Sequence, residues 1–105
     1  MLDKILPLTK QLISIKSTFD NQKALDKILE LALSNLRGYT IEKFENNGVK
    51  SALIYSSKKR PKGFKIILNG HLDVIPGKGK QYKPVIDNNK LYGVGSMDMK
   101  ASIAC

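Results

Sequence analysis

Residue types that often build enzyme sites or covalent cross-links are scarce in this sequence. Tryptophan is absent, and histidine and cysteine each occur once among 105 residues. The single cysteine, Cys105, cannot form a disulfide within the chain, and nothing else in the composition calls for an oxidising compartment. We therefore expect a cytoplasmic protein, in which any site built on imidazole can draw only His71 from this chain.

Long hydrophobic runs are also missing. Residues 1–16 contain Asp3, and Pro7, Lys10 and Gln11 interrupt their apolar positions. This pattern fits neither the core of a signal peptide nor a membrane span, so we expect no membrane association. The length allows one small domain with a modest core.

Acidic residues are few: nine Asp and Glu face 18 Lys and Arg, which gives a net charge of +9. Such a balance raises nucleic acid or an acidic surface as a partner. The densest basic run, residues 56–63, has no interleaved aromatic side chains on which bases could stack. The pattern favours solvated charges and argues against nucleic-acid binding as the main function, although a basic binding module stays open as an alternative.

Apolar residues at helical spacing predict two helices near the N-terminus. The first has Leu8, Leu12, Ile13 and Ile15 on its apolar face and should end near Ser17, with Pro7 tolerated only in its first turn. The second follows an N-cap at Asp20 or Asn21 and reaches a C-cap at Gly38.

Three β-rich segments follow. Residues 39–45 and 49–57 flank Asn47-Gly48, a pair that favours a tight hairpin turn. Residues 64–75 include the run Ile66–Leu68, which is typical of a central strand covered on both faces, so the fold class is α/β with helices layered on a sheet. The remaining predicted elements are a small hairpin over residues 85–92 and a glycine loop at 93–99 that leads into a helix.

His71 and Asp73 lie near the end of the predicted central strand, in the stretch "NGHLDVIPG". Because alternate residues of a strand point to the same side, their side chains should project together. An imidazole that binds a metal through one nitrogen is usually held by a carboxylate on the other nitrogen. The alternative is a hydrogen-bonded core histidine with Asp73 as a loop cap.

Asp98 is the one carboxylate in the stretch "LYGVGSMDMKAS". Gly93 and Gly95 would let the backbone bend sharply and carry Asp98 towards another part of the fold. A dinucleotide-binding interpretation of "GVGSMD" lacks the third glycine of that motif. Taken alone, Asp98 could equally be a helix cap.

Together, "NGHLDVIPG" and "LYGVGSMDMKAS" resemble the paired signature of the M20 family of metallopeptidases, which includes aminoacylases, acetylornithine deacetylases, succinyl-diaminopimelate desuccinylases and dipeptidases. The resemblance implies a zinc-peptidase-like catalytic domain of αβα layers around a mixed sheet. Residues 1–105 would be its truncated N-terminal portion, without the lid and dimerisation domain. The full-length protein would then be a homodimer.

The resemblance also implies roles for three residues. His71 corresponds to a metal ligand, Asp73 to the catalytic-site carboxylate that orients this histidine, and Asp98 to the carboxylate that bridges two metal ions. The implied cofactors are two divalent ions, zinc by preference, with cobalt or manganese as alternatives of similar ligand chemistry. The implied reaction is hydrolysis of an amide bond in an N-acyl amino acid or a short peptide.

The sequence departs from the family pattern at four positions without removing a ligand: Val94 replaces an arginine, Ala101 and Ser102 replace glycines, and Tyr82 lies near the place of a tryptophan.

The larger gap is in the ligand set. The family's adjacent glutamates, a further carboxylate and a second histidine follow the bridging aspartate, whereas only seven residues, "MKASIAC", follow Asp98. Glu30, Glu42 and Glu45 fall in the predicted second helix and first hairpin. We expect a fragment that is inactive alone; the alternative to truncation is a subunit that needs a partner chain to complete its metal site.

Overall fold

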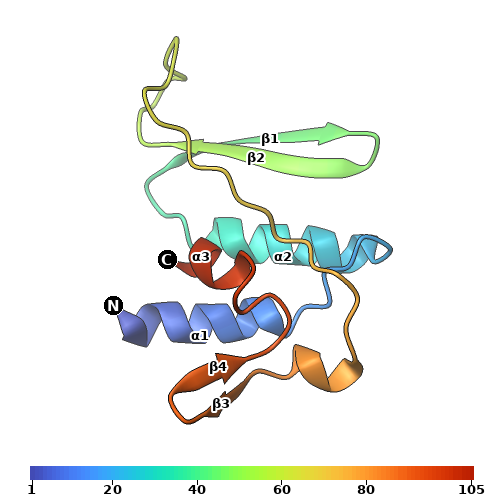
Figure 1. Cartoon of the computed structure of the whole chain (residues 1–105). Coiled ribbons are helices and arrows are strands. Elements are labelled where there is room, and N and C mark those ends of the chain that lie inside the picture. Colours follow the sequence, from blue (N-terminus) through green and yellow to red (C-terminus); the bar gives the residue numbers. More distant parts are fainter.

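The computed structural model describes all residues, 1–105, and begins with two antiparallel helices joined by a short connection (Figure 1). Helix α1 spans Leu2–Ile13, and thus ends before its predicted end near Ser17. Half-buried Ile5 and Leu6 extend its apolar face towards the N-terminus. Pro7 therefore lies inside the helix, where it removes one backbone hydrogen bond, and its predicted place in the first turn is wrong.

Helix α2 spans Gln22–Ser34 and begins as predicted, with Asn21 as its N-cap. The Asn21 side-chain oxygen accepts a hydrogen bond from the backbone N–H of Ala24 at 3.2 Å. The helix ends before Gly38, whose φ of +82° instead belongs to the turn that leads into the first strand.

Strands β1 (Thr40–Asn46) and β2 (Val49–Tyr55) form the predicted antiparallel hairpin. Both residues of its two-residue turn, Asn47 and Gly48, have positive φ, as such a turn requires. Two ion pairs connect the hairpin to α2, from Lys43 Nζ to Glu30 at 2.7 Å and from Lys50 Nζ to Asp26 at 3.0 Å. Hydrogen bonds from Gln22 and Lys50 hold the pKa of Asp26 below its usual value.

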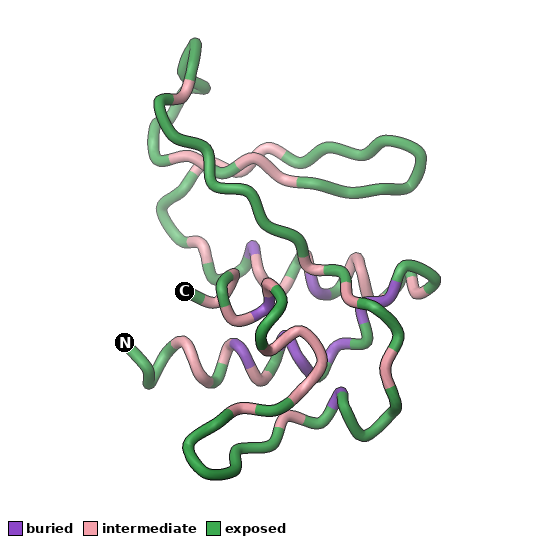
Figure 2. The backbone as a smooth tube through the Cα atoms, in the orientation of Figure 1, coloured by how far each residue is buried: buried purple, intermediate pink, exposed green.

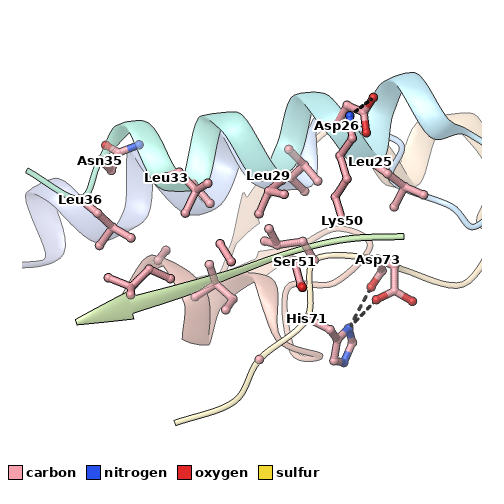
Figure 3. A pocket seen from close by; sticks show the side chains of 18 of the residues that line it. Leu25, Asp26, Leu29, Leu33, Asn35, Leu36, Lys50, Ser51, His71 and Asp73 are labelled. Carbon is pink, nitrogen blue, oxygen red and sulfur yellow. Dashed lines mark hydrogen bonds and ion pairs between the residues drawn. The ribbon is translucent and has the colours of Figure 1, made fainter. Parts of the chain in front are cut away.

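The central strand predicted over residues 64–75 is wrong for this chain. This segment is extended but has no strand beside it, and the chain contains two separate antiparallel sheets, β1–β2 and β3–β4, in place of one mixed sheet. Residues 68–73 and part of β2 line one apolar cavity of about 1200 Å³, so the segment has no ladder partner on that side (Figure 3). Without partners or a covering layer, Ile66, Ile67 and Leu68 are 79%, 70% and 93% exposed.

The C-terminal third agrees with the sequence patterns. A 3₁₀ turn at Gly79–Tyr82 precedes strands β3 (Val85–Asp87) and β4 (Lys90–Tyr92), which pair around Asn88 and Asn89, both at positive φ. The glycine loop then leads into the short helix α3 (Lys100–Ala104). The α/β class is therefore confirmed.

The core lies where α1, α2 and α3 meet. Leu12 and Ile28 are fully buried there, and Ile103 of α3 packs against them. Only ten of 105 residues are buried, and most of these lie on or just after α1 and on α2 (Figure 2). No helix is both long enough and apolar enough to cross a bilayer. The positions of the loops that carry the two sequence motifs therefore depend on packing against this small core.

The contact between the glycine loop and α1 gives a direct test of this packing. A Cβ on Gly93 would lie 2.5 Å from Cγ2 of fully buried Ile13. We expect Gly93→Ala to lower the free energy of unfolding by about 1 to 3 kcal/mol, because the methyl overpacks the core. The measurement is urea unfolding. Gly79→Ala is the control, since a Cβ there meets no atom within 4 Å, and equal midpoints for both variants would contradict this packing.

Candidate metal centre

The first motif is held by the connection that follows α1. The hydroxyl of Ser17 donates to the carbonyl of Leu72 at 2.7 Å, and the N–H of Val74 donates to the carbonyl of Ser17 at 2.9 Å. These two bonds fix the backbone on both sides of Asp73. Ser17 itself is fully buried and its bond to Leu72 is partly buried, which limits the access of water to the bond.

Gly70 lets the same motif approach α3. A Cβ at this position would lie 2.6 Å from Cδ1 of Ile103 and 2.9 Å from Cε of Met99. The backbone just before His71 can therefore pack against Met99 and Ile103 only because residue 70 has no side chain.

The second motif folds into two tight turns. Gly95 has a φ of +81°, and its carbonyl accepts from the N–H of Lys100 at 3.1 Å. Met99 has φ 71° and ψ −36°, and around it the N–H of Lys100 also bonds the carbonyl of Asp98 at 3.1 Å. This arrangement is a γ-turn with positive φ, which is rare and strained for a residue with a side chain.

The two motifs meet at the ring of His71. Nδ1 lies 3.2 Å from Oδ1 and 3.1 Å from the backbone oxygen of Asp73, and Nε2 lies 3.6 Å from Oδ1 of Asp98. Figure 3 shows His71 and Asp73 side by side at the edge of the cavity below α2. The structure thus brings together all three residues that the sequence singled out. None is a buried core residue, because the side chains of His71, Asp73 and Asp98 are 47%, 62% and 81% exposed.

The two nitrogens of the His71 ring face different groups, Nδ1 towards Asp73 and Nε2 towards Asp98. With its proton on Nδ1, the imidazole donates to Asp73 and leaves the lone pair of Nε2 directed to the side of Asp98. This is the orientation in which a carboxylate fixes the tautomer of a metal-binding histidine.

The donors on the Nε2 side suit a divalent ion. Two donors about 2.1 Å from a tetrahedral ion lie roughly 3.4 Å apart, close to the 3.6 Å between Nε2 of His71 and Oδ1 of Asp98. No group of three His, Cys, Asp or Glu side chains converges as a metal site in this chain. The pair therefore fits part of a coordination shell, and no third side chain of these types joins it on that side.

The three glutamates of the chain supply no further donor to this site. Glu30 is on α2 and pairs with Lys43, while Glu42 and Glu45 are on β1, where Arg60 contacts Glu42 at 3.5 Å. Their positions agree with the sequence-based expectation that they lie away from the site.

Sequence reasoning missed two residues that support the motifs, Ser17 and Lys100. Lys100 is fully buried, and its ammonium donates to the carbonyl of Ile15 at 2.9 Å. Burial lowers the pKa of Lys100 to about 8. No local pattern indicated this position, because a lysine is rarely buried without a charged partner.

Tyr82, near the place of the family's tryptophan, is also buried, and its hydroxyl accepts a hydrogen bond from the N–H of Gly77 at 3.0 Å. Val94, at the place of the family's arginine, packs against the same glycine, since a Cβ on Gly77 would lie 2.8 Å from Cγ2 of Val94. These two departures from the family pattern thus pack against the end of the first motif at Gly77.

Comparison with known proteins agrees with the two motifs. Residues 67–105, which contain both, match the profile of peptidase family M20/M25/M40. The chain is similar to the M20 peptidases over this part, and the resemblance noted in its sequence is confirmed.

Succinyl-diaminopimelate desuccinylases are similar to the chain over nearly its whole length. The enzyme of Nautilia profundicola is 34% identical over 95% of the chain, that of Sphingopyxis alaskensis 38% over 94%, and that of Buchnera aphidicola subsp. Cinara cedri 36% over 99%. The aligned part is 27%, 28% and 28% of these proteins respectively, so the chain spans little more than a quarter of their length.

The buried hydroxyl of Ser17 should contribute measurably to stability. We expect Ser17→Ala to lower the free energy of unfolding by about 1 kcal/mol, because the carbonyl of Leu72 loses its hydrogen bond from the hydroxyl. Urea unfolding is the measurement. Ser14→Ala is the matched control, since that hydroxyl is exposed and bonds only within its own helix end. Equal effects of the two substitutions would show that the Ser17 contact does not hold the motif.

Proposed function

We propose that this chain forms part of the catalytic domain of a metal-dependent amide hydrolase. The observation that carries the proposal is the position of His71, with Nδ1 at the carboxylate of Asp73 and Nε2 facing the carboxylate of Asp98. The similarity to M20 peptidases and to desuccinylases supports the same class of reaction.

In this proposal His71 and Asp98 bind metal and Asp73 orients His71. Nε2 of His71 and the carboxylate of Asp98 are the donors, and the carboxylate of Asp73 keeps the proton on Nδ1. Two divalent ions, zinc by preference, would supply the Lewis acidity that amide hydrolysis requires. The exposure of the Asp98 side chain leaves room for a second ion on its other oxygen, in keeping with a bridging role.

The proposed substrates are N-acyl amino acids or short peptides. Among N-acyl amino acids, N-succinyl compounds come first, because the similar proteins named above are desuccinylases.

The two donors supplied here are too few for a closed site. A catalytic zinc ion takes three protein ligands and keeps one position open, whereas this chain brings only His71 and Asp98 to the same side of the ring. The rest must come from residues outside these 105, either on a longer chain or on a second one.

The test compares the 105-residue chain with the protein as its gene encodes it, or with that product and the partner that co-purifies with it. We expect the 105-residue chain to bind Zn²⁺ weakly and to hydrolyse N-acetyl and N-succinyl amino acids at a negligible rate. We expect the complete protein to hydrolyse them in a metal-dependent way and to lose at least about 100-fold in rate on His71→Ala, because a ligand is removed.

Lys62→Ala, on the exposed basic loop, is the control and should leave the rate unchanged. Full activity after His71→Ala would refute the proposed metal centre. Metal-dependent turnover by the 105-residue chain alone would refute the claim that further donors are needed.

A further inference from the structure

Lys100 is the only charged residue among the ten that are buried. It belongs to α3, and its ammonium reaches across the core to the carbonyl of Ile15, 85 residues earlier in the chain. It forms no ion pair, and its aliphatic part packs against Gly95, where a Cβ would lie 2.7 Å from Cδ of Lys100.

Stability alone does not explain a lysine at this position. Burying an ammonium group against one neutral acceptor is costly, and an apolar side chain of similar volume usually fills such a space at least as well. The carbonyl of Ile15 would keep a partner without Lys100, because it also accepts from the N–H of Ser17 at 2.9 Å. We therefore look for a role of the Lys100–Ile15 bond in the backbone geometry around Lys100.

The geometry concerned is the γ-turn at Met99. A positive φ at a residue with a side chain persists only when its surroundings impose it. Lys100 is the next residue, and its N–H bonds both Gly95 and Asp98. The bond from its ammonium to Ile15 thus fixes the end of the turn that directs Asp98 towards His71.

We propose that Lys100 is a positioning residue: its hydrogen bond to Ile15 holds the strained turn at Met99, and this turn aims the carboxylate of Asp98 at Nε2 of His71. The proposal rests on the proposed function of Asp98 as a metal ligand. Because Ser17, two residues after Ile15, holds the His71 motif, one short segment sets the distance between the two donors.

The test is Lys100→Met in the protein as its gene encodes it, with any partner that completes the site. Methionine keeps the length and most of the apolar volume and removes only the ammonium. Titration with Zn²⁺ alone should give a Kd about 10 to 100 times higher than that of the unmodified protein, as loss of a group that orients a ligand typically does. The absorption spectrum of the Co²⁺-loaded protein should change as well, while the urea midpoint stays the same or rises.

Three further variants separate positioning from stability. Ile28→Val weakens the same core but keeps both the Lys100 ammonium and its acceptor, and it should lower the midpoint without changing the Zn²⁺ Kd. Lys62→Met removes an exposed charge and should change neither quantity. Lys100→Arg keeps a donor for Ile15 and should recover most of the affinity that Lys100→Met loses.

An unchanged Zn²⁺ Kd in Lys100→Met would overturn the inference and leave the proposed function standing. The inference would also be overturned if Lys100→Met and Ile28→Val lost the same stability and the same Zn²⁺ affinity. If Lys100→Met does not fold, Lys100→Gln decides, because its shorter, uncharged side chain loses the ammonium bond to Ile15 and should raise the Kd; an unchanged Kd there overturns the inference. If the unmodified protein neither binds Zn²⁺ nor hydrolyses an N-acyl amino acid, the proposed function fails, and the inference with it.

Discussion

The hydrogen bonds made by the segment Ile15–Ser17, just after α1, determine where the two motifs meet. Ser17 holds the backbone on both sides of Asp73. The carbonyl of Ile15 accepts a hydrogen bond from the ammonium of Lys100, and this bond holds the loop that carries Asp98. These bonds lie in or beside the small helical core, where the bond of Lys100 is buried and the bond of the Ser17 hydroxyl is partly buried. The separation of His71 from Asp98 is therefore fixed through a third segment, and the direct contact between their exposed side chains contributes little to it.

This dependence explains why the site is exposed and yet ordered. The three site side chains face solvent, whereas the groups that hold their backbones, Ser17 and Lys100, are fully buried. Glycine makes the close approaches possible: Gly70 admits Ile103, and Gly95 admits the Lys100 side chain. The β1–β2 hairpin contributes to the apolar cavity but supplies no donor to His71 (Figure 3).

Local signals in the sequence predicted the elements that local interactions determine. The Asn21 cap, the turns at Asn47-Gly48 and Asn88–Asn89 and the helix after the glycine loop are all present. The central strand was not found, because pairing depends on neighbouring strands that these 105 residues do not place beside 64–75. The meeting of His71 and Asp98 followed from resemblance to a family, whereas the burial of Lys100 arises from a contact over 85 residues that no local pattern encodes.

The proposed function and the positioning role of Lys100 both require that His71 and Asp98 are donors to the same divalent ion. The most direct measurement is anomalous diffraction at the zinc edge from crystals of the gene's complete product, with its partner chain if it has one, grown with Zn²⁺. We expect a zinc peak about 2.1 Å from Nε2 of His71 and from a carboxylate oxygen of Asp98, with Nδ1 still hydrogen-bonded to Asp73. Zinc bound to Nδ1 of His71, or zinc bound to neither His71 nor Asp98, would contradict a shared metal site.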